Sequence, residues 1–301
     1  MSIPIIFVHR SNSDYLKYSL SQAKYFSPNS EVILIGDESN DAFPFIRHFL
    51  ITDYFESAAN FAKIYEHLSF NDRDYELFCF QRWFIIKDFI EKNGINDFLY
   101  LDSDTLLFCD ANEEFVKYRN YDFTICNKMS PQFTYFSSRK SLVSFCAYVE
   151  NLYSNEKMRE RLLAKFKKHR DENLSGGVCD MTAFREYNRD YPNRVFEALS
   201  VVDNSTFDNN LNFPEGYEFD VKNNIKKVYY KRKLPYCKSQ NGLKIRFKGL
   251  HCQGGAKKLM YKLFRGKNYF SNYLKIEINN FYNEVKNKIR LKSRIKKIFG
   301  G

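Results

Sequence analysis

The chain has 301 residues, of which 44% are hydrophobic and 18% aromatic, and its formal net charge is +11. This composition predicts a packed globular protein and excludes an intrinsically disordered one. Seven cysteines without a CxxC pair exclude a disulfide framework and a zinc site of the paired-cysteine type, so we expect reduced thiols in or near the core. The apolar run at residues 3–8 is too short for a signal peptide or a membrane span, so we expect a cytoplasmic protein.

The first hundred residues alternate strand and helix patterns. Residues 3–8 and 31–36 are short apolar runs, typical of parallel strands that are buried on both faces. Residues 16–26 carry apolar side chains at helical spacing, and residues 75–94 predict a long buried helix. Residues 97–101 supply the next strand. This alternation predicts an α/β fold with a mixed, mainly parallel sheet flanked by helices.

The second half of the chain predicts more mixed structure. Residues 138–169 have a helical and increasingly basic pattern, and a short helix is expected over 182–190. Residues 203–242 are rich in Asn and Asp and predict loops over one end of the sheet. Further strands are expected over residues 121–126, 175–181, 194–202 and 243–250.

Two aspartates, Asp102 and Asp104, follow the apolar strand at the edge where open α/β sheets bind ligands. Residues two apart in extended backbone share a face, so both carboxylates are expected to face one ligand. Hard oxygen ligands suit Mg²⁺ or Mn²⁺ held jointly with substrate phosphates. The simpler alternative stays open, in which one aspartate caps a turn and the other is merely solvated.

A second alternative is a phosphatase of the haloacid-dehalogenase type, which uses one aspartate of such a pair as nucleophile and the other as acid/base. Those enzymes usually have threonine where this chain has Leu106. Asp203 and Asp208 would then imitate the later metal motif of that family.

A second motif lies far downstream, in FKGLHCQGGAKK at residues 247–258, where Gly254 and Lys257 follow His251 by three and six residues. Imidazole is a good Mn²⁺ ligand, glycine lets the backbone approach a phosphate, and lysine neutralises a diphosphate. Alone, His251 is more often a structural or surface histidine. Together with the aspartate pair, it completes a predicted metal–diphosphate site.

The combination of FLYLDSD, NLSGGV and HCQGGAK resembles the GT-A nucleotide-sugar transferases, and most of all glycosyltransferase family 8, which includes glycogenin and bacterial lipooligosaccharide galactosyltransferases. The resemblance is spread in islands over most of residues 1–258. It implies a GT-A, Rossmann-like fold and the transfer of a sugar from a UDP-sugar donor to a glycan or lipid-linked acceptor, with retention of configuration. The implied cofactor is Mn²⁺ or Mg²⁺.

The resemblance also implies roles for individual residues. Asp102, Asp104 and His251 would be the metal ligands, and Lys257 would contact the diphosphate. Arg82 occupies the place of a family arginine that contacts the donor, with a surface arginine as the alternative. The other implied donor contacts are His9, Asn12, Ser103, Gly176, Gly177 and Gly254. For the loop that contains His9 and Asn12, the alternative is a simple helix N-cap near Ser13. For Gly176 and Gly177, the alternative is close packing alone.

Catalytic residues are implied by a family motif that places a glutamine between two acids beside the reacting carbon. The match here is residues 203–205, so Asp203 and Asn204 are the implied catalytic residues, with Asn204 in place of glutamine. Asp180 and Asp208 are further candidate carboxylates near the reaction.

The predicted organisation is a catalytic domain over residues 1–256 and a basic aromatic tail over 257–301. The tail carries thirteen Lys or Arg and two Glu, so it holds the whole net charge. Residues 285–299 can form a helix with one apolar face, the pattern of a segment lying on an anionic membrane surface. We therefore expect a peripheral protein on the inner face of a membrane, with no nucleic-acid partner. The alternative is a non-enzymatic basic module that binds membrane or nucleic acid.

Overall fold

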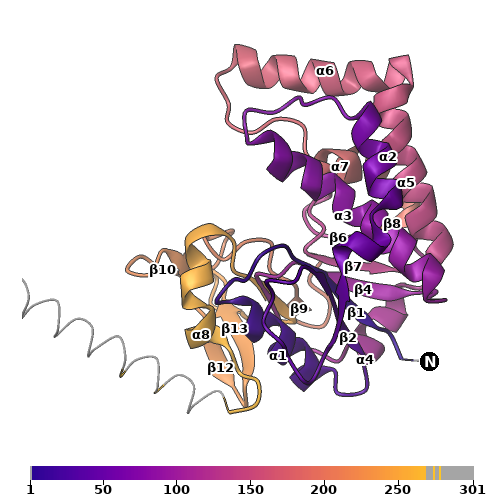
Figure 1. Cartoon of the computed structure of the whole chain (residues 1–301). Coiled ribbons are helices and arrows are strands. Elements are labelled where there is room, and N and C mark those ends of the chain that lie inside the picture. The colour runs from indigo at the N-terminus through magenta and orange to yellow at the C-terminus, as the bar shows by residue number, and fades with distance from the viewer. Residues whose placement is uncertain (1, 269–273, 275–277, 279–301) are drawn as a thin grey trace, which may run out of the picture.

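The computed structural model describes residues 2–268, 274 and 278. In this part of the chain a seven-stranded sheet forms the centre of the fold (Figure 1). Its neighbouring strands are parallel, except that β7 runs antiparallel to both β4 and β6. The mixed, mainly parallel sheet is therefore confirmed. In spatial order its strands are β3 (Arg47–Leu50), β2 (Val32–Gly36), β1 (Ile5–Val8), β4 (Phe98–Leu101), β7 (Phe133–Phe136), β6 (Phe123–Ile125) and β8 (Val195–Glu197).

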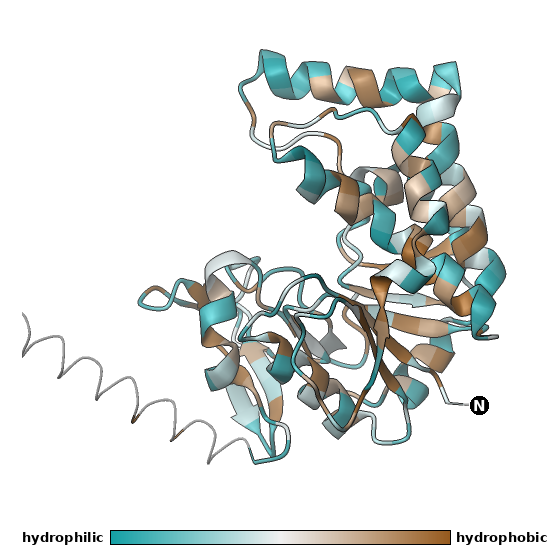
Figure 2. Cartoon of the chain, viewed as in Figure 1, coloured by the Kyte–Doolittle hydropathy of each residue, from teal (hydrophilic) through white to brown (hydrophobic). Residues whose placement is uncertain are grey.

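Helices cover both faces of this sheet. On one face Ile6 and Val8 join a core built with α2, α3, α5 and α7, and on the other Ile5 and Phe7 pack with α1 and the segment after β5. Since alternate strand residues point to opposite faces, this double cover explains the continuous apolar runs, and the central strands are hydrophobic in Figure 2. The helices are α1 (Leu16–Phe26), η1 (Ile51–Tyr54), α2 (Glu56–Ile64), α3 (Arg73–Lys92), α4 (Ala111–Glu114), η2 (Phe115–Tyr118), α5 (Arg139–Ser154), α6 (Glu156–Asp171), α7 (Asp180–Asp190), η3 (Pro192–Arg194), η4 (Gly254–Leu259) and α8 (Met260–Leu263).

Smaller sheets lie beside α1 and α8, on the far side of the central sheet from the helices α2, α3 and α5 to α7 (Figure 1). They contain short strands where the sequence predicted only loops over 203–242, and that prediction is wrong. The strands of the smaller sheets are β5 (Thr105–Leu107) with β15 (Gly249–His251), β10 (Phe219–Asp220) with β11 (Ile225–Lys226), and β12 (Tyr229–Lys231), β13 (Leu234–Lys238), β14 (Lys244–Phe247) and β9 (Ser205–Thr206). Strands β9 to β13 fall in the segment 203–242, whose polar composition does not distinguish a strand from a loop.

Breaks inside elements account for the other local differences from the sequence predictions. Asn155 divides the predicted helix 138–169 into α5 and α6, because its side chain accepts a hydrogen bond from Met158 N and caps α6. The predicted strand 243–250 is two strands in different sheets. The chain changes sheets at Lys248, whose backbone bonds Thr206 O on one side and Phe108 N on the other. The predicted strand 194–202 is reduced to β8, three residues long.

The glycine-led segment 175–181 is not the strand that the sequence predicts. Gly177 alone forms an isolated bridge, to Ser69, and α7 then begins at Asp180. The bridge holds the loop before α7 against the loop before α3, with Val178 N donating to Leu68 O at 2.8 Å. This contact fixes the start of α7 relative to α3.

Replacing Gly177 with alanine is expected to lower the free energy of unfolding by about 1–3 kcal/mol. A Cβ at this position would lie 2.5 Å from Leu68 O and 2.6 Å from the Ser69 Cα, and the backbone φ of +156° is unfavourable for other residues. Urea denaturation gives the change. Gly255→Ala is the matched control, because a Cβ there meets nothing within 4 Å. Equal stability of the two variants would contradict the steric argument.

The segment after residue 256 begins inside the fold. Met260, Leu263 and Phe264 are buried, and the first two belong to the core of the smaller sheets. The predicted membrane-surface helix 285–299 lies outside the described residues and stays a prediction. Among the helices that the structure describes, none is both long and apolar enough to cross a bilayer.

Candidate functional site

The carboxyl edge of the central sheet positions the two aspartates. Strand β4 ends at Leu101, and the next backbone N–H, that of Asp102, donates to Gln132 O at 3.2 Å. The chain then turns at once, because Thr105 bonds the Asp102 carbonyl through both its N–H and its hydroxyl. This tight turn presents Asp104 beside Asp102 at the sheet edge.

Strand β15 brings His251 to the same place from a distant part of the sequence. It pairs antiparallel with β5, so that His251 lies opposite Thr105. Ligand atoms of Asp102, Asp104 and His251 all lie within 4.8 Å of one another. The three residues that the motifs singled out are therefore brought together, and two carboxylates with one imidazole form a donor set that suits Mn²⁺ or Mg²⁺.

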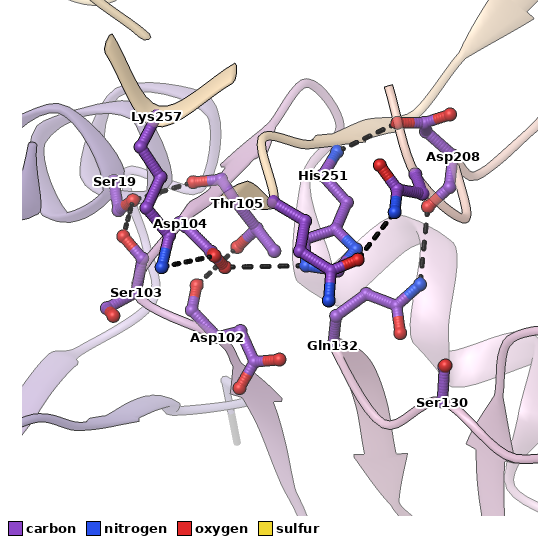
Figure 3. Close-up of polar contacts among 12 residues, drawn as sticks. Ser19, Asp102, Ser103, Asp104, Thr105, Ser130, Gln132, Asp208, His251 and Lys257 are labelled. Carbon is purple, nitrogen blue, oxygen red and sulfur yellow. Dashed lines mark hydrogen bonds and ion pairs between the residues drawn. The ribbon is translucent and has the colours of Figure 1, made fainter. Parts of the chain in front are cut away.

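Asp104 lies between two cationic groups (Figure 3). Its Oδ1 is 3.5 Å from His251 Nε2 and its Oδ2 is 3.2 Å from Lys257 Nζ. Burial raises the pKa of Asp104, but His251 and Lys257 lower it by more, so the pKa lies well below its usual range. Burial lowers the pKa of His251, but Asp104 outweighs this and raises it to about 9. The imidazole therefore has to release a proton before Nε2 can serve as a metal ligand.

The other ring nitrogen of His251 is held by the backbone. Nδ1 donates to Asn209 O at 2.6 Å, which leaves Nε2 facing the aspartates. The backbone N–H of His251 donates to Asp208 Oδ2 at 3.1 Å. Both contacts come from the segment just after β9, so this segment sets the orientation of the imidazole.

Asp208 in turn belongs to a buried ion cluster with Lys226, and both side chains are 0% exposed. Lys226 Nζ donates to Asp208 Oδ1 at 2.7 Å, to Asn210 O at 2.7 Å and to Glu215 Oε2 at 2.6 Å. Burial lowers the pKa of Lys226, but Asp208 and Glu215 raise it by more, so the ammonium stays charged. Burial raises the pKa of Asp208, and Lys226 opposes that rise. Both of its oxygens are engaged, by Lys226 and by the His251 N–H, so Asp208 supports the site and is not free to attack.

Arg82 is partly buried, with its side chain 15% exposed, and lies between two carboxylates. Its Nη1 donates to Asp102 Oδ1 at 2.8 Å, and its Nη2 pairs with Asp180 Oδ2. Tyr100 adds a second donor to Asp102 Oδ1, at 2.6 Å. The alternative of a surface arginine is therefore wrong. Asp180 also accepts from Trp83 Nε1 and from the Met181 N–H, so its oxygens position Arg82 and are not available to attack a substrate.

The loop after β1 forms another wall of the site. His9 Nε2 lies 3.1 Å from Ser13 Oγ, and α1 has no side-chain N-cap, so the capping alternative for this loop is wrong. Burial lowers the pKa of His9, as does Lys257, while Asp37 opposes them. Asn12 is exposed on the same loop.

Backbone at Ser103 and Gly254 shapes the site from two sides. The Ser103 carbonyl accepts from Ser19 Oγ at 2.5 Å, which ties the aspartate turn to α1. Gly254 has φ +56° and begins η4, the helix that carries Lys257 back over Asp104. The spacing of glycine and lysine after the histidine therefore has a conformational reason.

Asp203 and Asn204 are not brought to this site. Both are exposed, with φ of +50° and +53°, and they form the two-residue turn between Val202 and Ser205. Asp203 lies with Asp110, beyond the end of β5 that leads away from Asp104. The implied catalytic role of this pair is therefore not supported by its position. The residues beside His251 are instead 208–210, five positions further along the chain.

Gln132 is a site residue that the sequence did not suggest. It is 1% exposed, and its Nε2 donates to Asn209 O at 3.2 Å. Its Oε1 is buried and has no hydrogen-bond partner among the described residues. Gln132 lies directly beside Asp102 because of the register between β4 and β7, and the sequence does not reveal that register.

No protein-family model matches the chain, and no curated protein matches it in sequence. Among solved structures, mouse xyloside xylosyltransferase 1 in its apo form matches with a TM-score of 0.47 and 9% identity, over 65% of this chain and 85% of that chain.

Two further solved structures match less well. The apo bifunctional glycosyltransferase WbbM matches with a TM-score of 0.42 and 9% identity, over 90% of this chain and 51% of that chain. The glycosyltransferase GlyE of Streptococcus pneumoniae TIGR4 matches with a TM-score of 0.30 and 14% identity, over 65% of this chain and 45% of that chain. All three are glycosyltransferases, but at these scores and identities only the geometry of the site can carry an assignment of function.

Proposed function

We propose that the protein is a metal-dependent glycosyltransferase that moves a sugar from a UDP-sugar donor to a glycan or lipid-linked acceptor. The observation that carries the proposal is the cluster of Asp102, Asp104 and His251 within 4.8 Å, with Lys257 at 3.2 Å from Asp104. Two carboxylates, an imidazole and a flanking lysine at the carboxyl edge of an α/β sheet are suited to a divalent cation shared with a diphosphate.

Each residue has a part in the proposed reaction. Asp102, Asp104 and His251 would hold Mn²⁺ or Mg²⁺, which when bound stabilises negative charge on the leaving diphosphate. Lys257 adds a positive charge beside that diphosphate and assists its departure. Arg82 fixes Asp102 through a hydrogen bond of 2.8 Å, so this carboxylate is oriented before substrate arrives. His9 and Asn12 are proposed contacts of the nucleoside.

The phosphatase alternative fits the site less well. It requires a free nucleophilic aspartate, whereas Asp102 accepts hydrogen bonds from Arg82 and Tyr100. The acids that would complete its metal motif are also unsuitable, because Asp203 lies on an exposed turn and Asp208 is buried against Lys226. The proposed retention of configuration, the membrane-surface tail and a cytoplasmic location stay proposals from the motif resemblance and composition.

Calorimetric titration of UDP tests the proposal on the full chain. Binding is expected with Mn²⁺ present and is expected to disappear when EDTA removes the metal, because the diphosphate would otherwise face two carboxylates without a cation between them. UMP, which lacks the diphosphate, is the control ligand and is expected to show little metal dependence. UDP binding that is absent, or equal with and without metal, would overturn the proposal and favour the non-enzymatic basic module.

A further inference from the structure

A cavity of about 860 Å³ is lined by residues that take no part in the proposed metal site. Its walls are the hairpin between β6 and β7, the outer face of α7 and strand β8. The parallel strands β6 and β8 end at Ile125 and Glu197, which both line the cavity. The cavity therefore opens at the same carboxyl edge of the sheet as Asp102, where α/β sheets bind ligands.

The hairpin and the helix that line the cavity also reach the proposed metal site. Residues 127–129 form the tip of the hairpin, and three positions later Gln132 lies beside Asp102. Ser130 Oγ lies 3.3 Å from Met181 Sδ, and Met181 follows the aspartate that holds Arg82. A molecule in the cavity would therefore lie against the same hairpin and helix that reach Asp102 and Arg82.

The negative charges in the cavity wall are already engaged. Both oxygens of Glu197 accept backbone hydrogen bonds, from Asn127 N at 2.9 Å and from Lys128 N at 2.6 Å. The buried Glu186 carboxylate is shared among three arginines and forms an ion pair with each, the contact with Arg185 measuring 3.6 Å. The lining therefore holds three cationic side chains against these two carboxylates, a net charge of +1.

The exposed charged groups of the wall are cationic. Arg185 and Arg189, one helical turn apart on α7, are 43% and 51% exposed. Lys128 is exposed at the hairpin tip and lines the cavity. Opposite these groups the floor is apolar, formed by Ile125 and Val195.

We propose that this cavity binds the acceptor, and that the acceptor is a saccharide carrying a carboxylate or phosphate. An apolar floor suits the face of a sugar ring, and three cationic groups at the rim would attract an acidic substituent. This inference rests on the proposed glycosyltransferase function and adds the substrate class to it.

Ligand-observed NMR titrations with the full chain, UDP and Mg²⁺ test this inference. Glucuronic acid and glucose 6-phosphate serve as the carboxylate and phosphate probes, and glucose is the neutral reference. We expect at least one acid to bind about three- to tenfold more tightly than glucose, as partly exposed ion pairs allow. The stronger of the two acids identifies the substituent. Lys128→Glu and Arg185→Gln should each reduce this preference, and Lys140→Glu, an exposed lysine on α5, should preserve it.

Equal binding of glucose and both acids, or a preference that survives both cavity substitutions, would overturn the inference. Metal-dependent UDP binding is measured on the same samples, so that a failure of the acceptor assignment can be distinguished from a failure of the transferase function. UDP binding without an acid preference overturns the acceptor assignment alone. An acid preference without metal-dependent UDP binding overturns the transferase function and with it the acceptor role of the cavity.

Discussion

Replacing Asp104 with alanine is expected to weaken metal-dependent UDP binding by at least about 100-fold, the upper range found when even supporting residues of metal sites are changed. Asp104 is the central residue of the site, because it faces His251 at 3.5 Å and Lys257 at 3.2 Å. Its loss removes a proposed ligand and leaves two cationic groups without the carboxylate between them. Asp104→Asn keeps the volume and removes only the charge, and it should fail in the same way.

Titration calorimetry with UDP and Mn²⁺ measures this loss, and circular dichroism checks that each variant folds. Asp41→Ala is the matched control, because Asp41 is exposed on the loop between β2 and β3. Metal-dependent UDP binding retained in Asp104→Ala would remove this residue from the metal site. A loss of equal size in the control would point to an unspecific effect of net charge.

Replacing Lys226 with methionine is expected to lower the free energy of unfolding by about 3–5 kcal/mol, the cost of leaving a buried charge without its partner. Lys226 and Asp208 are both 0% exposed, and the ammonium donates to three oxygens, so no water can take its place without rearrangement. Asp208 also holds the backbone of His251. The same substitution is therefore expected to weaken metal-dependent UDP binding by about 10–100-fold.

Urea denaturation measures the stability, and calorimetry measures the binding. Adding Asp208→Asn to Lys226→Met removes the unpaired charge while keeping an oxygen for the His251 N–H, so part of both losses should be recovered. Lys222→Met, at an exposed lysine in the turn after β10, is the control and should be near neutral. A Lys226→Met protein as stable as this control would show that the ion cluster does not support the site.

Local patterns predicted the parts of the molecule that depend on neighbouring residues. Short apolar runs gave β1, β2 and β4, and helical spacing gave α1 and α3, because burial on both faces of a parallel sheet leaves a continuous apolar signal. The strand end at Leu101 also predicted where Asp102 and Asp104 would lie. Polar segments carried no such signal, so strands β9 to β13 were missed and residues 175–181 were wrongly predicted as a strand.

The sequence by itself determined the ligand chemistry of the site, which is two aspartates after an apolar strand and a histidine followed by glycine and lysine. That these motifs form one site was predicted from their complementary chemistry and from the family resemblance. Only the tertiary structure decided which polar residues support that site. Asp203 and Asp208 lie five positions apart and look alike in sequence, yet the first is exposed on a turn and the second holds His251. Asp203 lies in the turn before β9, whereas Asp208 lies after β9, where its backbone N–H donates to Gly249 O of β15. Such contacts between strands distant in sequence depend on register and sheet packing, which no local pattern encodes.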